Sequence, residues 1–165
     1  NAKANFKHAV ELSGIGHVTQ RMMMSERKET LHELQAAKHG VQQACAEAGV
    51  QVADIDMAEV HDCFTINQML CVEAMGLSEQ GRAGYDFMEG KYDADSECPI
   101  NLSGGLKSKG HPVGATGASM HALMYKQLTG TPIGVAAKGQ PEHAMTVNIG
   151  GSGVTNCVSV LRRIQ

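Results

Sequence analysis

The sequence predicts an α/β fold in which helices pack against a mixed β-sheet, and three observations support this prediction. A short strand over residues 57–61 runs directly into a helix over residues 65–75. A helix with an apolar stripe covers residues 30–48. Two alternating segments, residues 143–149 and 154–161, surround a glycine-rich turn and predict an antiparallel pair at the end of the sheet. Strands that lead directly into helices are typical of α/β domains.

Length and composition indicate one globular domain that spans residues 1–165. A chain of 165 residues with 42% hydrophobic and 19% charged residues can bury a sizeable core. The net charge of −3 leaves no broad basic surface for nucleic acid or an acidic membrane. No apolar run approaches the roughly 18 residues that a membrane helix needs. We therefore expect neither nucleic acid nor membrane among the partners.

The first predicted element is a strand over residues 10–18, although Gly14 and Gly16 weaken it. His17 lies on this strand, and a single histidine on a strand is more often structural than catalytic. The two helices that follow are predicted to begin at capping boxes and to end at glycines. In the first helix, Thr30 and Glu33 form the capping box and Gly49 ends the helix. In the second, Thr65 and Gln68 form the capping box and Gly76 ends the helix.

Residues 77–103 lack periodicity, and a connection of this length is usually functional or flexible. They lead into a glycine-rich segment, residues 104–117, before a helix over residues 114–128. Five glycines in this segment surround His111, which is followed by Pro112. Such clusters persist where the backbone needs a positive φ or a close approach to another molecule. The proline restricts how the imidazole points.

The glycine-rich segment does not match a nucleotide-binding motif. Gly105-x4-Gly110 begins like a phosphate loop, but a His-Pro pair stands where Lys-Ser/Thr is required. The spacing of Gly110, Gly114 and Gly117 also differs from the dinucleotide fingerprint. Neither nucleotide interpretation is therefore retained.

A metal site is also disfavoured. His61, Cys63, Cys98 and His111 offer ligand atoms, but no pair of them has the usual spacing of a zinc site. The five cysteines include no C-x-x-C pair, so we expect a reducing compartment and no disulfide framework.

His61 and Cys63 lie where the predicted strand runs into a helix N-terminus, at the edge of the sheet where α/β proteins bind ligands. A helix N-terminus and a nearby imidazolium both lower a thiol pKa, which makes Cys63 a candidate acid or base. His111 and Gly150 come from two further glycine-rich turns. Two histidines, a thiol and bare backbone N–H groups are the parts of an acyl-transfer site. The alternative is a structural strand end with a hydrogen-bonded histidine and a buried cysteine.

Three motifs, in this order and approximate spacing, resemble those of thiolases. They are His61-Asp62-Cys63-Phe64, Gly110-His111-Pro112-x-Gly114 and Asn148-x-Gly150-Gly151. The whole chain is similar to the C-terminal half of a thiolase, in the sterol-carrier-protein-type branch with the His-Asp-Cys-Phe motif. The resemblance implies one thiolase-like half, a three-layer α/β/α domain around a five-stranded mixed sheet.

The resemblance also implies roles for four residues. His111 would activate a nucleophilic cysteine that the N-terminal half supplies, and would contact the developing oxyanion. His61 would help to build the first oxyanion hole together with a bound water. Ordinary thiolases carry a second catalytic cysteine in a C-x-G motif, where this chain has Asn-Ile-Gly. In the resembled branch that thiol comes from the position of Cys63, and the backbone N–H of Gly150 would still serve the second oxyanion hole.

The function implied by the resemblance is Claisen condensation or thiolysis of 3-ketoacyl-CoA through a cysteine acyl-enzyme. Coenzyme A thioesters would be the substrates, and no tightly bound cofactor is expected. No cysteine here matches the family nucleophile, so we expect the chain alone to be inactive. Its N-terminal half would belong to the same chain or to a separate subunit. We expect a homodimer or higher oligomer in the cytoplasm, or in peroxisomes if eukaryotic, although the last residues carry no targeting signal.

Two other functions remain open at this point. One is a thiolase-like subunit of a lyase or acyltransferase complex, in which the fold serves retro-aldol cleavage or an acceptor other than coenzyme A. The other is a non-catalytic scaffold that binds a thiolase partner. The presence of His61, Cys63 and His111 together argues against a degenerate site.

Overall fold

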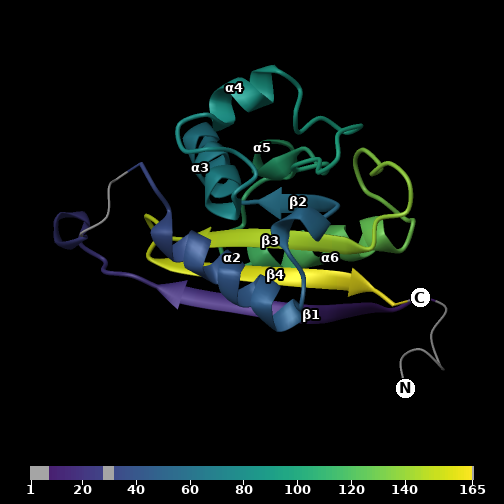
Figure 1. The fold of residues 1–165 in the computed structure, drawn as a ribbon, viewed down its shortest axis with the longest axis horizontal. Coiled ribbons are helices and arrows are strands. Elements are labelled where there is room, and N and C mark those ends of the chain that lie inside the picture. The colour runs from purple at the N-terminus through teal and green to yellow at the C-terminus, as the bar shows by residue number, and fades with distance from the viewer. Residues whose placement is uncertain (1–7, 28–31, 165) are drawn as a thin grey trace.

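The computed structural model describes residues 8–27 and 32–164, and these residues form a mixed sheet of four strands. The strands are β1 (Val10–Thr19), β2 (Met57–Val60), β3 (His143–Gly150) and β4 (Thr155–Arg163). Their order across the sheet is β1-β4-β3-β2 (Figure 1). β4 pairs antiparallel with both β1 and β3, whereas β2 pairs parallel with β3. The predicted antiparallel pairing of these two C-terminal strands, β3 and β4, is confirmed, but its predicted place at the end of the sheet is wrong, because the pair forms the centre of the sheet.

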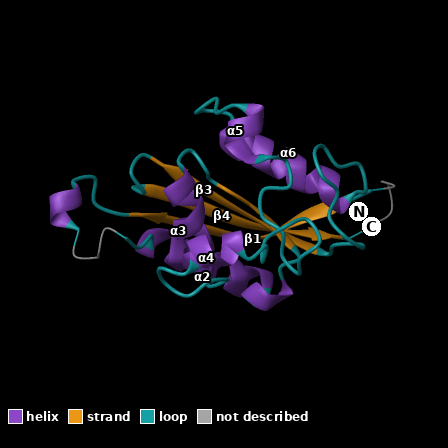
Figure 2. Ribbon diagram, turned by 90° about the horizontal axis from the view of Figure 1, so that it is seen from above, coloured by secondary structure: helices purple, strands orange, loops and turns teal. Residues whose placement is uncertain are grey.

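Helices cover both faces of the sheet. They are α2 (Gln35–Ala48), α3 (Thr65–Met75), α4 (Ala83–Met88), α5 (Gly105–Lys109) and α6 (Thr116–Leu128), with single-turn 3-10 helices η1 (Met24–Glu26) and η2 (Val52–Asp54). α2 and α3 cover one face and α6 covers the other, so the domain has three layers (Figure 2). α4 packs on α3, and α5 lies next to the start of α6. The predicted α/β class is confirmed.

The five-stranded sheet expected from the resemblance is wrong for the described residues, which contain four strands. The chain does pass the free edge of β2, where Ile100 forms a single parallel bridge with Ala58. A longer ladder cannot form there because Pro99 has no N–H to donate. Asn101 has a φ of 55°, so the backbone leaves the extended conformation one residue after the bridge.

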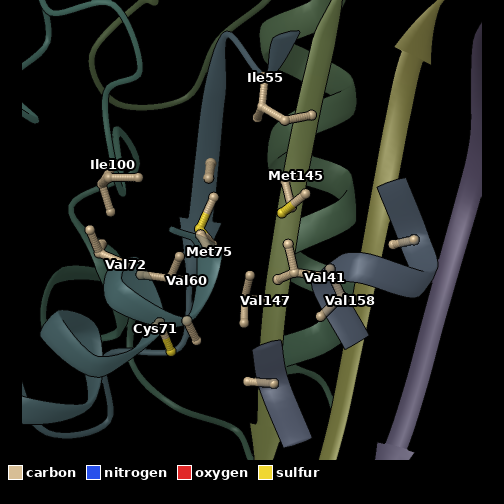
Figure 3. Packing of buried hydrophobic residues seen from close by; sticks show 14 of the residues in the cluster. Val41, Ile55, Val60, Cys71, Val72, Met75, Ile100, Met145, Val147 and Val158 are labelled. Atoms are coloured by element: carbon tan, nitrogen blue, oxygen red, sulfur yellow. The ribbon is translucent and has the colours of Figure 1, made fainter. Parts of the chain in front are cut away.

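The side chains along each strand point alternately into two apolar clusters, one on each face of the sheet. Met57 and Ala144 belong to the cluster under α6, whereas Val60 and Val147 belong to the cluster on the side of α2 and α3 (Figure 3). Because side chains of a strand alternate between faces, His61 continues the α6 face of β2. The polar end of β2 therefore faces the layer that contains the glycine-rich segment.

The two glycines that weaken β1 as a strand are required for its packing. A Cβ at Gly14 would overlap the carbonyl oxygen of Ala44, and a Cβ at Gly16 would overlap that of Gly40. Ala44 and Gly40 both lie on α2, so the helix backbone packs directly on the strand backbone. Close approach of this kind is one of the roles of glycine in a strand.

Gly16→Ala should therefore lower the free energy of unfolding by about 1–3 kcal/mol, the usual cost of overpacking. The added methyl group forces α2 and β1 apart. Chemical denaturation of the protein that carries this domain measures the change. Ile15→Ala is the matched control because the Ile15 side chain is exposed on the same strand. Equal midpoints for the two variants would contradict the prediction.

The helices differ from prediction at their N-terminal ends and agree with it at their C-terminal ends. α2 begins later than predicted, and Thr30 lies outside the described residues. α3 begins at Thr65 itself, so its hydroxyl does not cap the helix and the predicted capping box with Gln68 is wrong. Gly49 and Gly76 follow the last helical residues in the left-handed conformation, as predicted.

Candidate active site

His61 lies directly after β2 and is held through both its backbone and its ring. Its N–H donates to the Val147 carbonyl at 2.9 Å, which continues the pairing with β3. The side chain is buried, and its Nδ1 lies 3.1 Å from Oδ1 of Asn148. Because an amide oxygen only accepts, Nδ1–H donates and the neutral ring keeps an unprotonated Nε2. The Asn67 amide donates to the His61 carbonyl at 2.5 Å.

His111 lies on the loop between α5 and α6, and its ring is exposed. Its Nδ1 is 2.7 Å from the hydroxyl oxygen of Thr116, a buried residue at the start of α6. The Thr116 hydroxyl donates its hydrogen to the Pro112 carbonyl at 3.2 Å. The hydroxyl oxygen must therefore accept from His111, which places the proton on Nδ1 and leaves the Nε2 lone pair free. This is the tautomer that a general base requires.

The two imidazoles meet edge to face. Their ring centroids are 4.9 Å apart and their planes are inclined by 76°. Burial lowers the pKa of His61, and the charge of His111 lowers it further, against smaller opposing effects of Asn148 and Asp62. His61 is therefore neutral at neutral pH, and its Nε2 accepts hydrogen bonds.

Cys63 lies two residues beyond His61 with an exposed side chain. It lines a cavity of about 320 Å³ together with Phe64 and the turn over residues 151–153. Burial raises the pKa of its thiol, whereas the backbone N–H of Phe64 lowers it to a smaller extent. The lowered pKa expected from the sequence is wrong, because α3 begins only at Thr65 and neither imidazole shifts the thiol.

Gly150 ends β3 and opens the turn to β4. The turn is clamped from the segment after β1: Arg27 donates to the Ser152 carbonyl at 2.7 Å, and the Gln20 amide donates to the Gly153 carbonyl at 2.6 Å. Gly153 has a φ of 77°, a conformation that favours glycine. The exposed Gly150 therefore lies at the end of a rigid turn, two residues after the Asn148 that orients His61.

The structure thus brings His61 and His111 into direct contact and places Gly150 on the neighbouring strand. Within the described residues, no hydrogen bond or ring contact joins Cys63 to either imidazole. The other four cysteines are less suited to an acid–base role at this site. Cys45 and Cys71 are buried, Cys98 is partly buried with its pKa raised to about 12, and Cys157 is exposed on β4.

Two residues that orient the histidines, Asn148 and Thr116, are absent from the sequence-based site. Asn148 lies two residues before Gly150 on β3, so both face the same side of the sheet, and this alternation could have identified Asn148 as a site residue. Thr116 follows His111 by five residues across a loop, and no periodicity reveals that contact. Among the described residues, no group of three or more His, Cys, Asp or Glu side chains is arranged to hold a metal ion. No helix in the same part of the chain is long and apolar enough to cross a membrane.

Comparison with known proteins identifies the family of the chain. Residues 16–163 match the family described as Thiolase C-terminal domain-like. The chain belongs to this family. The resemblance inferred from the three sequence motifs is thereby confirmed over most of the chain.

Curated relatives of this thiolase C-terminal domain are longer proteins. It is 41% identical over 139 residues to an acetyl-CoA acetyltransferase of Methanothermobacter thermautotrophicus, an alignment that covers 82% of the chain and 35% of the relative. It is 34% identical over 131 residues to sterol carrier protein 2 of Rattus norvegicus, covering 75% of the chain and 24% of that protein. The chain therefore spans about a third or less of the length of these relatives.

A solved structure shares the fold. The Ltp2-ChsH2(DUF35) aldolase superposes with a TM-score of 0.81 at 22% sequence identity, covering 96% of this chain and 41% of that chain. At this identity the likeness supports the thiolase-like α/β fold, and it carries no argument about the reaction.

Proposed function

We propose that this domain is the C-terminal half of an acyl-CoA thiolase that catalyses Claisen condensation or thiolysis of 3-ketoacyl-CoA. The observation that carries the proposal is the contact between His61 and His111, in which each Nδ1 makes a hydrogen bond and neither Nε2 has a hydrogen-bond partner among the described residues. Such a pair offers one base and one acceptor to a single reacting group. The relatives named acetyl-CoA acetyltransferase support acyl-CoA chemistry for the complete protein.

His111 would act as the base of the acylation step. Its free Nε2 takes the proton of a cysteine thiol supplied by the N-terminal half, and the resulting thiolate attacks the thioester carbonyl of the acyl donor in condensation, or the 3-keto carbonyl of 3-ketoacyl-CoA in thiolysis. Collapse of the tetrahedral adduct forms the acyl-enzyme and releases coenzyme A thiolate in condensation, or the enolate of an acyl-CoA in thiolysis. The proton now on Nε2 of His111 can donate to the oxyanion before this collapse.

His61 would act without changing its protonation state. Its neutral Nε2 accepts a hydrogen bond from a water molecule, and that water donates its second hydrogen to the oxyanion. Asn148 holds the ring in this tautomer. This arrangement accounts for how a buried imidazole with a lowered pKa can still serve an oxyanion hole.

Cys63 would exchange the α-proton of the second substrate. In thiolysis the thiol protonates the enolate of the departing acyl-CoA, and in condensation the thiolate removes the same proton. The raised pKa keeps the thiol protonated at neutral pH, which favours the proton-donating direction. The N–H of Gly150 would bind the enolate oxygen, and one donor of this kind contributes about 3 kcal/mol.

The same groups support a second candidate, a lyase subunit that cleaves a carbon–carbon bond by a retro-aldol reaction. This reaction needs a base and an enolate-binding site but no nucleophilic thiol. The observation compatible with it is that, among the described residues, no hydrogen bond joins a cysteine to either imidazole ring. An acyl-enzyme intermediate distinguishes the two functions, because only the thiolase forms one.

The test compares the 165-residue chain alone with the complete protein, in which an N-terminal thiolase half is present on the same chain or added as a subunit. We expect no acetoacetyl-CoA cleavage by the chain alone and coenzyme A-dependent cleavage by the complete protein. Mass spectrometry of the complete protein should then show an acetylated cysteine on the N-terminal half. Turnover by the chain alone, or cleavage without a covalent acyl group, would overturn the proposal.

A further inference from the structure

Glu59 is a fully buried carboxylate that the reaction above does not use. It lies on β2, two residues before His61 and on the same face of the strand. Its Oε2 accepts from Lys109 Nζ and from the Ser103 hydroxyl, both at 2.8 Å, and its Oε1 accepts from the Ser103 N–H at 3.1 Å. Lys109 also donates to the Ser103 hydroxyl oxygen at 2.8 Å.

Lys109 is the last residue of α5, and Gly110 and His111 follow it directly. The ion pair therefore connects the residue that precedes the His111 loop with the strand that leads into His61. The other end of α5 is joined to the same strand end, because Asp62 accepts from the Leu106 N–H at 2.9 Å. α5 is thus fastened at both ends to the segment over residues 59–62.

The surroundings of the pair indicate what it contributes. A carboxylate with this burial is costly to desolvate, and a buried ion pair is often no more stabilising than apolar residues of similar volume. Its hydrogen bonds do constrain geometry, since three donors converge on the Glu59 carboxylate. Among the described residues, by contrast, the exposed His111 ring has one hydrogen bond, to Thr116 at the start of α6 on the C-terminal side of its loop. A fixed Lys109 supplies the missing anchor on the N-terminal side of that loop.

We infer that the Glu59–Lys109 ion pair is a positioning element that sets the separation of the His61 and His111 rings. It makes Glu59 and Lys109 positioning residues, which act on the reaction only through His111. The inference rests on the proposed function for its kinetic consequence. The geometric consequence, the ring contact at 4.9 Å, does not depend on that function.

The test uses three variants of the complete protein. Lys109→Met removes the anchor but leaves Glu59 charged and buried, so it can also impair folding. Glu59→Gln with Lys109→Met removes the anchor without a buried unpaired charge, and its amide oxygen still accepts from Ser103. Lys91→Met is the matched control, because Lys91 is paired with the buried carboxylate of Asp86 on α4, which contacts neither imidazole.

We expect the double variant to fold and to show a kcat about 10- to 100-fold lower with KM within twofold, as for a catalytic group misplaced by about 1 Å. Crystal structures should show the two ring centroids further apart than 4.9 Å in the double variant and unchanged in Lys91→Met. A double variant with unchanged ring geometry and wild-type kcat would overturn the inference, even if its Tm falls. A complete wild-type protein without thiolase activity would refute the proposed function, and the ring separation would still decide the positioning role.

Discussion

Replacing His111 with alanine should lower kcat for acetoacetyl-CoA thiolysis by about 100- to 10,000-fold in the complete protein, the range found for loss of a general base. The fold should survive, since the His111 ring is exposed and, among the described residues, its one side-chain hydrogen bond is to Thr116. The loss should appear in the acylation step, because the nucleophilic thiol would no longer be deprotonated. Rapid quenching followed by mass spectrometry measures the rate at which the acyl-enzyme forms.

His17→Ala is the matched control for this experiment, because His17 is an exposed histidine on β1. Its kcat should stay within twofold of the wild-type value. A non-catalytic scaffold would tolerate both substitutions equally. Full activity of His111→Ala would therefore remove the acid–base role proposed for the glycine-rich loop.

The chemistry-bearing residues could be read from the sequence because they stand in short local motifs. His61 is placed at the edge of the sheet by the strand-to-helix order of its segment, and His111 is marked by its glycines and Pro112. The groups that orient the rings are harder to predict. The alternation of β3 places Asn148 on the same face as Gly150, but its contact with His61 depends on the pairing of β3 with β2. The contact of Thr116 with His111 across a loop has no sequence period.

The other errors of prediction have local causes that differ from one segment to the next. Pro99 and the positive φ of Asn101 reduce an expected strand to one bridge. α4 lies in the segment over residues 77–103, where six helical residues are too few to show a clear helical period. Cys63 falls just before α3, so burial outweighs the neighbouring N–H groups and raises the pKa of the thiol.

The two histidines therefore have different surroundings although their rings are in contact. The Nδ1 of buried His61 is bound to an amide, and its pKa is lowered, which suits a fixed acceptor. The Nδ1 of exposed His111 is bound to a hydroxyl whose hydrogen is already donated elsewhere, which suits a base that gains and loses a proton. Under the proposed function, this asymmetry favours His111 for the proton transfer of the acylation step, and the α-proton then requires a third group.

Cys63→Ala should supply the evidence for that third group. We expect carbon–carbon cleavage and condensation to fall by about 100- to 10,000-fold, as for removal of a general acid or base. Exchange of the acetyl group between coenzyme A molecules should persist within about tenfold, because the coenzyme A sulfur leaves as a thiolate and needs no proton from Cys63. Isotope exchange between coenzyme A and acetyl-CoA measures this half-reaction separately from thiolysis.

Cys157→Ala is the matched control, because Cys157 is the other exposed cysteine. The raised pKa of Cys63 also sets the direction of the pH dependence. Condensation needs the Cys63 thiolate, which becomes more abundant as pH rises, so the condensation rate of the wild-type protein should rise with pH. Cys63→Ala should lose this dependence. If condensation and its pH dependence both survive the substitution, the α-proton must move through a group outside the His-Asp-Cys-Phe motif, and Cys63 would then be a lining residue of its cavity.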